Sequence, residues 1–282
     1  MSHIIAKLKN LRNDLLLKLY LKKIPPELDE FNASIQFLKG KNVAIVIAFE
    51  QPWALNWLLT MAKKNLKNTT MLVFDNSRTL DMRSKIKSVC NKNRAFYFPL
   101  PIYKTLHVNR SHGMAMSWIY AHVIKATQPK IFGFIDHDLI PVSSINFSKH
   151  IQSKPFYGRP VGNPSGFWSL WAGYCLFKYK NLAHRKINFL YDFSRDLDTG
   201  GRNWNALYSH YVNSKSFFAL RTRRDIFLPK FKYARSIEFI DDQWIHIGGI
   251  SYNNNFDKKF NFFKALAKAL ELDQDWTKLL KK

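Results

Sequence analysis

The chain of 282 residues has little cysteine, little glycine or proline, and few acidic residues. Its two cysteines, Cys90 and Cys175, are too few for a disulfide framework or a four-cysteine zinc site, and they favour a reducing compartment. Eleven glycines and eleven prolines exclude a collagen-like or low-complexity protein. A hydrophobic share of 46% excludes a disordered chain, and the length suits one large α/β domain or two small ones.

Long apolar runs are also missing. The longest, at residues 43–49 and 15–17, fall far short of the roughly 20 residues that a membrane-spanning helix needs. Lys7, Lys9 and Lys18 interrupt the N-terminal segment and no small-residue cleavage site follows, so a signal peptide is not predicted. We therefore expect a cytoplasmic protein, with peripheral association at the inner face of the cytoplasmic membrane as an open alternative.

Acidic residues are outnumbered by basic ones. The chain has 44 Lys and Arg against 20 Asp and Glu, which gives a formal net charge of +24. Such an excess indicates an anionic partner: nucleic acid, a membrane surface or a phosphate-bearing substrate. No RNP, helix-turn-helix or zinc-finger pattern is present, so specific nucleic-acid binding is not expected. The charge favours anionic lipids and substrates that carry phosphate.

Basic amphipathic helices are predicted at both ends of the chain, within residues 1–30 and 256–282. The first, over 4–23, has an apolar stripe on one face and stops at Pro25-Pro26. Packing on the domain and lying on an anionic membrane both account for that stripe. The stripe consists of Ile4, Leu8, Leu11, Leu15 and Leu19, and the apolar side of the C-terminal helix, predicted over 260–280, consists of Phe262, Phe263, Leu266, Ala269 and Leu270.

Between residues 40 and 255, apolar strands alternate with helices. The continuous β-branched run at 43–49 predicts a strand that is buried on both faces. The alternation predicts βαβ units and a single Rossmann-like α/β domain with a mostly parallel sheet, in which ligands bind beyond the carboxyl ends of the strands. Further strands are predicted at 71–74, 95–98, 131–135 and 167–179, helices at 52–65, 80–89 and 111–125, and a Pro- and Gly-rich loop at 155–166.

Two aspartates, Asp136 and Asp138, directly follow the predicted strand at 131–135. Carboxylates two residues apart on an extended chain project to the same side. Mg²⁺ and Mn²⁺ prefer such oxygen ligands and often bridge to substrate phosphates. Although Asp-x-Asp also occurs in solvated turns, its position after a buried strand predicts a metal and diphosphate site.

These features resemble the nucleotide-sugar glycosyltransferases of the GT-A fold, most closely the family-two-type inverting enzymes, over about residues 42–252. Residues 71–77, Met-Leu-Val-Phe-Asp-Asn-Ser, resemble the second strand of that family, which ends in Asp-(Asp/Asn)-x-Ser. Residues 109–115, Asn-Arg-Ser-His-Gly-Met-Ala, resemble its Asn-x-Gly-x-x-x-Ala helix start. Asp136-His137-Asp138 matches the metal motif, and His246 resembles the C-terminal metal-ligating histidine.

The resemblance implies a metal-dependent enzyme that moves a sugar from a nucleotide-diphosphate donor, a UDP-sugar above all, to a glycan or glycolipid acceptor with inversion. It implies Mn²⁺ or Mg²⁺ on Asp136, Asp138 and His246, and a buried, hydrogen-bonded histidine is the alternative role for His246. Asp75 would accept a hydrogen bond from the pyrimidine N3–H, or else cap its strand end. The implied nucleotide contacts are Ala48, Phe49, Asp75, Asn76, Asn109, His112, Gly113 and Asp136.

The same resemblance implies a catalytic carboxylate, downstream of the metal motif, that deprotonates the acceptor. Asp198 is the first choice, Asp196 the second and Asp242 the third, and capping of a glycine-rich loop is the alternative role for Asp198. Two other functions stay open: a metal-dependent nuclease or nucleotidyltransferase, and a non-catalytic protein that binds a membrane surface. The expected acceptor contacts are Trp168, Trp171 and Arg202, although aromatic residues at such spacing more often belong to the core.

Overall fold

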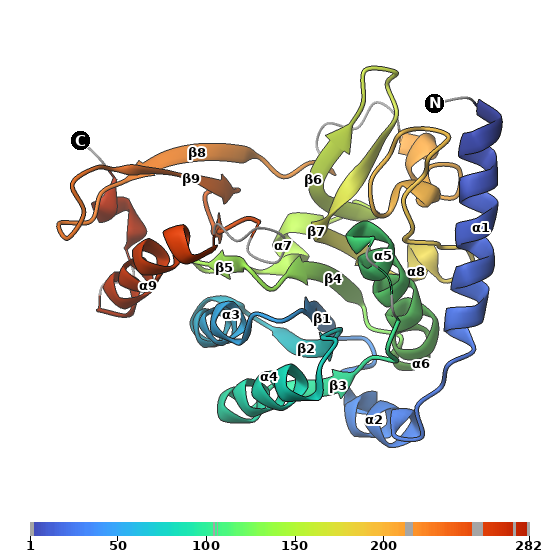
Figure 1. The fold of residues 1–282 in the computed structure, drawn as a ribbon, viewed down its shortest axis with the longest axis horizontal. Helices are drawn as coiled ribbons and strands as arrows, with labels where there is room; N and C mark the ends of the chain where they lie inside the picture. The colour runs from blue at the N-terminus through green and yellow to red at the C-terminus, as the bar shows by residue number, and fades with distance from the viewer. Residues whose placement is uncertain are drawn as a thin grey trace.

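The structure of the chain is a computed structural model (Figure 1). It describes residues 3–103, 105, 107–211, 217–249, 256–272 and 275–280, with the backbone alone for residues 256–258. Residues 250–255, which include the end of the segment that resembles the glycosyltransferases, lie outside the described residues.

A six-stranded sheet in the order β3-β2-β1-β4-β7-β6 forms the centre of the molecule (Figure 1). β3, β2, β1 and β4 are parallel to one another, β7 is antiparallel to β4, and β6 is antiparallel to β7. The predicted α/β class with a mostly parallel central sheet is therefore confirmed. The strands are β1 (Asn42–Ala48), β2 (Thr69–Asp75), β3 (Phe96–Pro99), β4 (Ile131–Asp136), β6 (Phe156–Gly162) and β7 (Trp168–Lys178).

Helices cover both faces of this sheet. Alternate side chains of β1 enter two different cores: Val46 lies in the one closed by α3, and Ile45 in the one closed by α5. Burial on both faces explains the continuous apolar run of β1. The helices are α1 (His3–Leu21), α2 (Leu28–Ile35), α3 (Pro52–Asn65), α4 (Leu80–Asn93), α5 (Val108–Ile119), α6 (Lys125–Thr127), α7 (Phe147–Ile151), α8 (Tyr179–Leu182) and α9 (Phe256–Leu272). Shorter turns are the π turn η2 (Tyr120–Ile124) and the 3₁₀ turns η1 (Gln36–Leu38), η3 (Gly201–Asn203), η4 (Tyr208–Tyr211) and η6 (Trp276–Leu279).

A second, antiparallel sheet in the order β5-β10-β9-β8 extends from the first and was not predicted (Figure 1). Its strands are β5 (Leu139–Pro141), β8 (Arg221–Ile226), β9 (Arg235–Ile240) and β10 (Trp244–His246). β5 and β10 have only three residues each, and β8 is mostly polar, so neither length nor periodicity identifies them. β5 begins directly after Asp138, so the second sheet holds the segment that follows the metal motif.

The predicted loop at 155–166 is wrong, because β6 occupies Phe156–Gly162. β6 is an edge strand, and its pairing with β7 shifts register between Gly158 and Pro160. Edge position and a bulge are the settings in which a strand tolerates proline, since no ladder hydrogen bond is lost.

The apolar side of α9 is buried in the core rather than on the surface. Phe262, Phe263, Leu266 and Leu270 are at most 3% exposed, and Phe263 packs against Trp57 of α3 with ring centroids 6.3 Å apart. This side of α9 therefore packs in the same hydrophobic core as α3 and the second sheet. Among the described residues, none of the helices has the length and hydrophobicity of a transmembrane segment.

The predicted N-terminal helix is confirmed, but α1 packs on the domain with the side opposite to its leucine stripe. Asn10 Nδ2 donates to Asp192 Oδ1 at 2.8 Å, and Arg110 Nε of α5 donates to Asn13 Oδ1 at 3.1 Å. The buried positions of α1 are Ala6, Asn10, Asn13, Leu17 and Tyr20, whereas Ile4, Leu8, Leu11, Leu15 and Leu19 are 54–69% exposed.

The start of α5 approaches a loop too closely for any side chain at Gly113. A Cβ there would lie 2.7 Å from the carbonyl oxygen of Phe189. We expect Gly113→Ala to lower the free energy of unfolding by about 1–3 kcal/mol, because the overlap outweighs the roughly 1 kcal/mol that alanine gains in helix propensity. Urea unfolding measures this change. Ser88→Ala on the exposed side of α4, where propensity acts alone, should be neutral or slightly stabilising. A Gly113→Ala protein as stable as the wild type would contradict the overlap.

Candidate metal centre and substrate cavity

Pairing of the second sheet brings His246 to the metal motif. In the β5–β10 pair, His246 lies opposite Leu139, and the amide of Ile247 donates to the carbonyl of Asp138 at 3.1 Å. Potential ligand atoms of Asp136, Asp138 and His246 lie within 4.8 Å of one another. Two carboxylates and one imidazole form a donor set that suits Mn²⁺ or Mg²⁺. The structure thus brings together the three metal ligands that the sequence predicts.

Glu238 on β9 sets the orientation of the His246 ring. Its Oε1 lies 3.1 Å from His246 Nδ1, and His246 Nε2 lies 3.8 Å from Asp138 Oδ1. A carboxylate on the far ring nitrogen is the usual support for a metal-ligating histidine. Burial lowers the pKa of His246, but the hydrogen bond to Glu238 and the negative charges of Asp138 and Asp136 outweigh burial and raise it.

Glu238 is itself held in its charged form. Burial opposes the charge, but the hydrogen bonds from His246 and Arg221 and the nearby guanidinium of Arg159 lower the pKa of Glu238 to about 2. Arg159 Nη1 donates to Oε1 at 3.1 Å, and Arg221 Nε donates to Oε2 at 2.6 Å. An ionised Glu238 accepts a hydrogen bond from the N–H of His246 Nδ1, which leaves Nε2 directed at the two aspartates.

Asp136 occupies a space that depends on Gly173 of β7. A Cβ at position 173 would lie 2.3 Å from Asp136 Oδ2. Burial raises the pKa of Asp136, and the nearby Asp138 carboxylate raises it further despite the opposing effect of His112. Protons therefore compete with a cation for this carboxylate and for His246.

Two further hydrogen bonds hold the Asp136-His137-Asp138 segment in place. The His137 side chain is buried, with Nδ1 3.2 Å from the carbonyl oxygen of Ile47 on β1. The amide of Gly248 donates to Asp138 Oδ2 at 3.1 Å. Both contacts hold the motif between β1 and the segment that follows β10.

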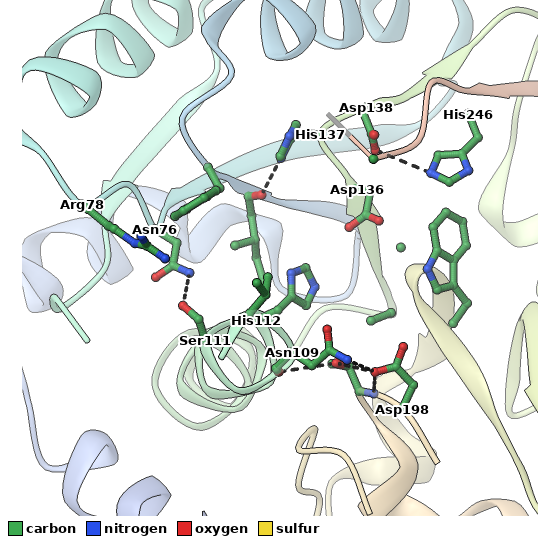
Figure 2. Close-up of a pocket in the computed structure, with 18 residues that line it drawn as sticks. Asn76, Arg78, Asn109, Ser111, His112, Asp136, His137, Asp138, Asp198 and His246 are labelled. Carbon is green, nitrogen blue, oxygen red and sulfur yellow. Dashed lines mark hydrogen bonds and ion pairs between the residues drawn. The ribbon is translucent and has the colours of Figure 1, made fainter. Parts of the chain in front are cut away.

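A cavity of about 240 Å³ opens beside the three metal-ligand candidates (Figure 2). Its walls come from the carboxyl ends of β1 and β2, the first turns of α5, β7, and the loop before η3. This is where a parallel sheet places its ligands. Six of the predicted nucleotide and acceptor contacts line it, namely Phe49, Asn76, Asn109, His112, Asp136 and Trp171.

The wall formed by α5 favours an anionic ligand. Asn109, Ser111 and His112 face the cavity from the first turns of the helix, where the helix dipole attracts negative charge. Arg78 lines the cavity as well and lies over the Phe49 ring, 5.3 Å from its centroid. His112 Nε2 is buried without a hydrogen-bond partner among the described residues, and burial lowers the pKa of His112. A ligand oxygen in the cavity would give that nitrogen a partner.

Asp198 lies on the side of the cavity away from Asp138 (Figure 2). Its Oδ1 accepts hydrogen bonds from Asn109 Nδ2 and from the amide of Thr199, both at 2.7 Å. Asp198 is exposed, and its Oδ2 has no hydrogen-bond partner among the described residues. One oxygen is thus held in place while the other is available to a proton donor in the cavity.

The other two predicted bases do not line the cavity. Asp196 is exposed, with φ of 51°. Asp242 lies in the turn between β9 and β10 and pairs with Arg224 Nη2 at 2.8 Å. The structure therefore does not bring either carboxylate to the metal ligands.

Several predicted contacts with donor and acceptor also lie away from the cavity. Asp75 is fully buried, and its two oxygens accept from the amide of Ser77 at 2.8 Å and from Tyr97 Oη at 3.0 Å. Trp168 packs in an aromatic group, 5.0 Å from Tyr208, and Arg202 pairs with Asp14 of α1. Ala48 and Gly113 do not line the cavity either.

Four cavity or supporting residues were missed in the sequence: Arg78, Ser111, Gly173 and Glu238. Ser111 Oγ accepts from Asn76 Nδ2 at 3.0 Å, which links α5 to the end of β2. Arg78 and Ser111 adjoin recognised motifs, so proximity in sequence was a usable signal. Glu238 and Gly173 reach the site only through strand register, which no local pattern reveals.

Comparisons with known proteins leave the family open. No family model matches the chain, and no curated protein matches it. Among solved structures, the mannosyltransferase PcManGT from Pyrobaculum calidifontis, in complex with GDP-Man and Mn²⁺, is 12% identical with a TM-score of 0.38, covering 64% of this chain and 56% of that one. S. aureus TarS is 12% identical with a TM-score of 0.34, covering 53% and 30%. At TM-scores of this size, neither likeness supports a conclusion about function.

We expect Glu238→Gln to weaken Mn²⁺ binding by about 10- to 100-fold, because the amide cannot hold His246 in the ligating tautomer as a carboxylate does. Titration of the purified protein with Mn²⁺, followed by calorimetry, measures the affinity. Glu271→Gln, at an exposed position of α9, is the matched control and should bind Mn²⁺ like the wild type. Unchanged affinity in Glu238→Gln would show that His246 does not need this support.

Proposed function

We propose that the protein is a metal-dependent glycosyltransferase that uses a nucleotide-diphosphate sugar as its donor. The observation that carries this proposal is the convergence of Asp136, Asp138 and His246 on the wall of a cavity at the carboxyl end of β4. The resemblance of the flanking motifs to GT-A enzymes supports the same assignment.

The cavity suits a diphosphate beside the metal ligands. Arg78 and the start of α5 supply positive potential on one wall, and His112 Nε2 offers an unpaired polar atom within it. A divalent cation on Asp136, Asp138 and His246 would neutralise the negative charge that develops on the departing diphosphate. The acidic residues at this site would otherwise repel such a ligand.

Asp198 is the base in this proposal. Its Oδ2 takes the proton of the acceptor hydroxyl, the acceptor oxygen bonds to the anomeric carbon, and the bond from that carbon to the diphosphate breaks. Asn109 and the amide of Thr199 hold the carboxylate in place through Oδ1. Attack on the face opposite the leaving group inverts the anomeric centre.

The acceptor is a glycan or a glycolipid, and Trp171 is its proposed platform. Trp171 lines the cavity and lies against the His246 ring, with ring centroids 4.8 Å apart. The guanidinium carbon of Arg159 lies 5.0 Å from the centroid of the Trp171 ring. An aromatic face beside the reacting centre suits the apolar face of a sugar. A uridine donor, inferred from Asp75, stays a prediction, because the described contacts of Asp75 are with its own chain.

We expect the protein to release a nucleoside diphosphate from at least one member of a nucleotide-sugar panel when Mn²⁺ or Mg²⁺ is present. EDTA should abolish this release, and Asp138→Asn should lower kcat/KM by about 100-fold or more, because a carboxylate ligand of the metal is lost. Asp225→Asn, at an exposed position of β8, is the control and should keep wild-type activity. Turnover that persists in EDTA would refute the metal role, and release of pyrophosphate instead would favour a nucleotidyltransferase.

Removal of the base should affect catalysis more than donor binding. We expect Asp198→Asn to lower kcat by about 100- to 10,000-fold with little change in the donor KM, because the amide cannot accept the acceptor proton. Asp196→Asn, two residues away but outside the cavity, should keep near-normal kcat. Initial rates at saturating donor separate the two variants. An equal loss of kcat in both variants, or no loss in either, would show that Asp198 is not the base.

A further inference from the structure

The outer face of α1 is an unusually apolar surface. Five side chains of the leucine stripe are more than half exposed, and they run along the helix for roughly 22 Å at 1.5 Å per residue. Ile24, just beyond the helix, is also 52% exposed. The stripe lies opposite the positions that bind the domain, so it plays no part in holding α1 to the rest of the chain. Nothing among the described residues covers it.

Basic side chains border this stripe on both sides. With 3.6 residues per turn, Lys7 and Lys18 lie along one edge and Arg12 along the other. All three are exposed, and Lys22 and Lys23 follow at the C-terminal end. Asp14 is the one acidic residue of α1, and it is turned inward, where it accepts from Asn188 Nδ2 at 3.1 Å and pairs with Arg202. The outward face therefore combines apolar area with positive charge alone.

We propose that α1 docks, with this face, on an anionic lipid bilayer. The helix would lie in the plane of the interface, with its leucines among the acyl chains and its lysines at the headgroup phosphates. Charge complementarity selects this occupant over a second copy of the chain. Two such faces packed together would bring the bordering cations of both helices side by side without acids to neutralise them.

The polar inner face makes α1 a firm attachment rather than a loose anchor. Asn10 and Asn13 bond to Asp192 and Arg110, and the Asp14–Arg202 pair joins the helix to η3, the turn directly after the loop that carries Asp198. Docking would thus orient the whole domain, with that loop toward the membrane (Figure 1). This inference does not depend on the proposed catalysis, since it uses none of the metal ligands.

Co-sedimentation of the purified full chain with vesicles tests the proposal. Vesicles of phosphatidylcholine mixed with an equal part of phosphatidylglycerol should bind at least about tenfold more protein than phosphatidylcholine alone. Leu11→Ser with Leu15→Ser should lower this binding about tenfold or more, and Leu15→Gln alone should lower it in part. Lys7→Gln with Lys18→Gln should also lower it. Asp138→Asn should bind like the wild type, whether or not the protein turns over a nucleotide sugar.

Matched controls separate this face from general charge and hydrophobicity. Leu80→Ser with Leu272→Ser removes two leucines that are each 82% exposed elsewhere, and Lys63→Gln with Lys87→Gln removes two exposed lysines. Both double variants should bind vesicles like the wild type, and thermal unfolding should be the same for every variant. Equal losses in the controls would overturn the proposal. Wild-type vesicle binding by the Leu11→Ser, Leu15→Ser double variant would also overturn it. So would a wild-type protein that forms a dimer in sedimentation velocity and does not bind vesicles, if the double variant no longer forms that dimer.

Discussion

The short antiparallel pair of β5 and β10 is the contact on which the candidate site depends. The parallel sheet alone supplies Asp136 and Asp138, both near the carboxyl end of β4, but the candidate imidazole ligand, His246, comes from a part of the chain far away in sequence. Register between β5 and β10 brings His246 opposite Leu139, and register between β10 and β9 brings Glu238 opposite His246. Two backbone pairings thus align a candidate metal ligand with the carboxylate that orients it. A slip of one residue would turn His246 to the opposite face of its strand.

Electrostatics divides the molecule between a basic exterior and an acidic centre. The chain carries a formal net charge of +24, yet three carboxylates, those of Asp136, Asp138 and Glu238, gather around His246. Arg159 and Arg221 neutralise Glu238, whereas Asp136 and Asp138 are left without an arginine or lysine among their described partners. The negative charge of these two aspartates, at the carboxyl end of a parallel sheet, is therefore not neutralised by an arginine or lysine side chain among the described residues. Such a pair is suited to bind a cation from solution.

The parallel half of the fold and the metal motif were predictable because their signals are local. The run at 43–49 and the strand before Asp136 follow from burial on both faces of a sheet, and His246 followed from a family resemblance. The second sheet could not be predicted, because β5 and β10 are too short to show a period and their pairing joins distant segments. The packing side of α1 was hidden for a similar reason. Asn10 is a poor core residue by composition, and its burial depends on Asp192, 182 residues further along the chain.

The inward bonds of α1 have a consequence for the reach of the candidate site. A helix with its side chains is about 10–12 Å across, so a lipid surface on the outer face of α1 would lie little more than that from the loop held by its inner face. Under the proposed docking, an acceptor that remains anchored in the bilayer could present its first sugars to Asp198 without leaving the membrane. The helix would then act as a spacer of set thickness, and the length of the acceptor's headgroup, rather than its affinity, would decide which lipids can be extended.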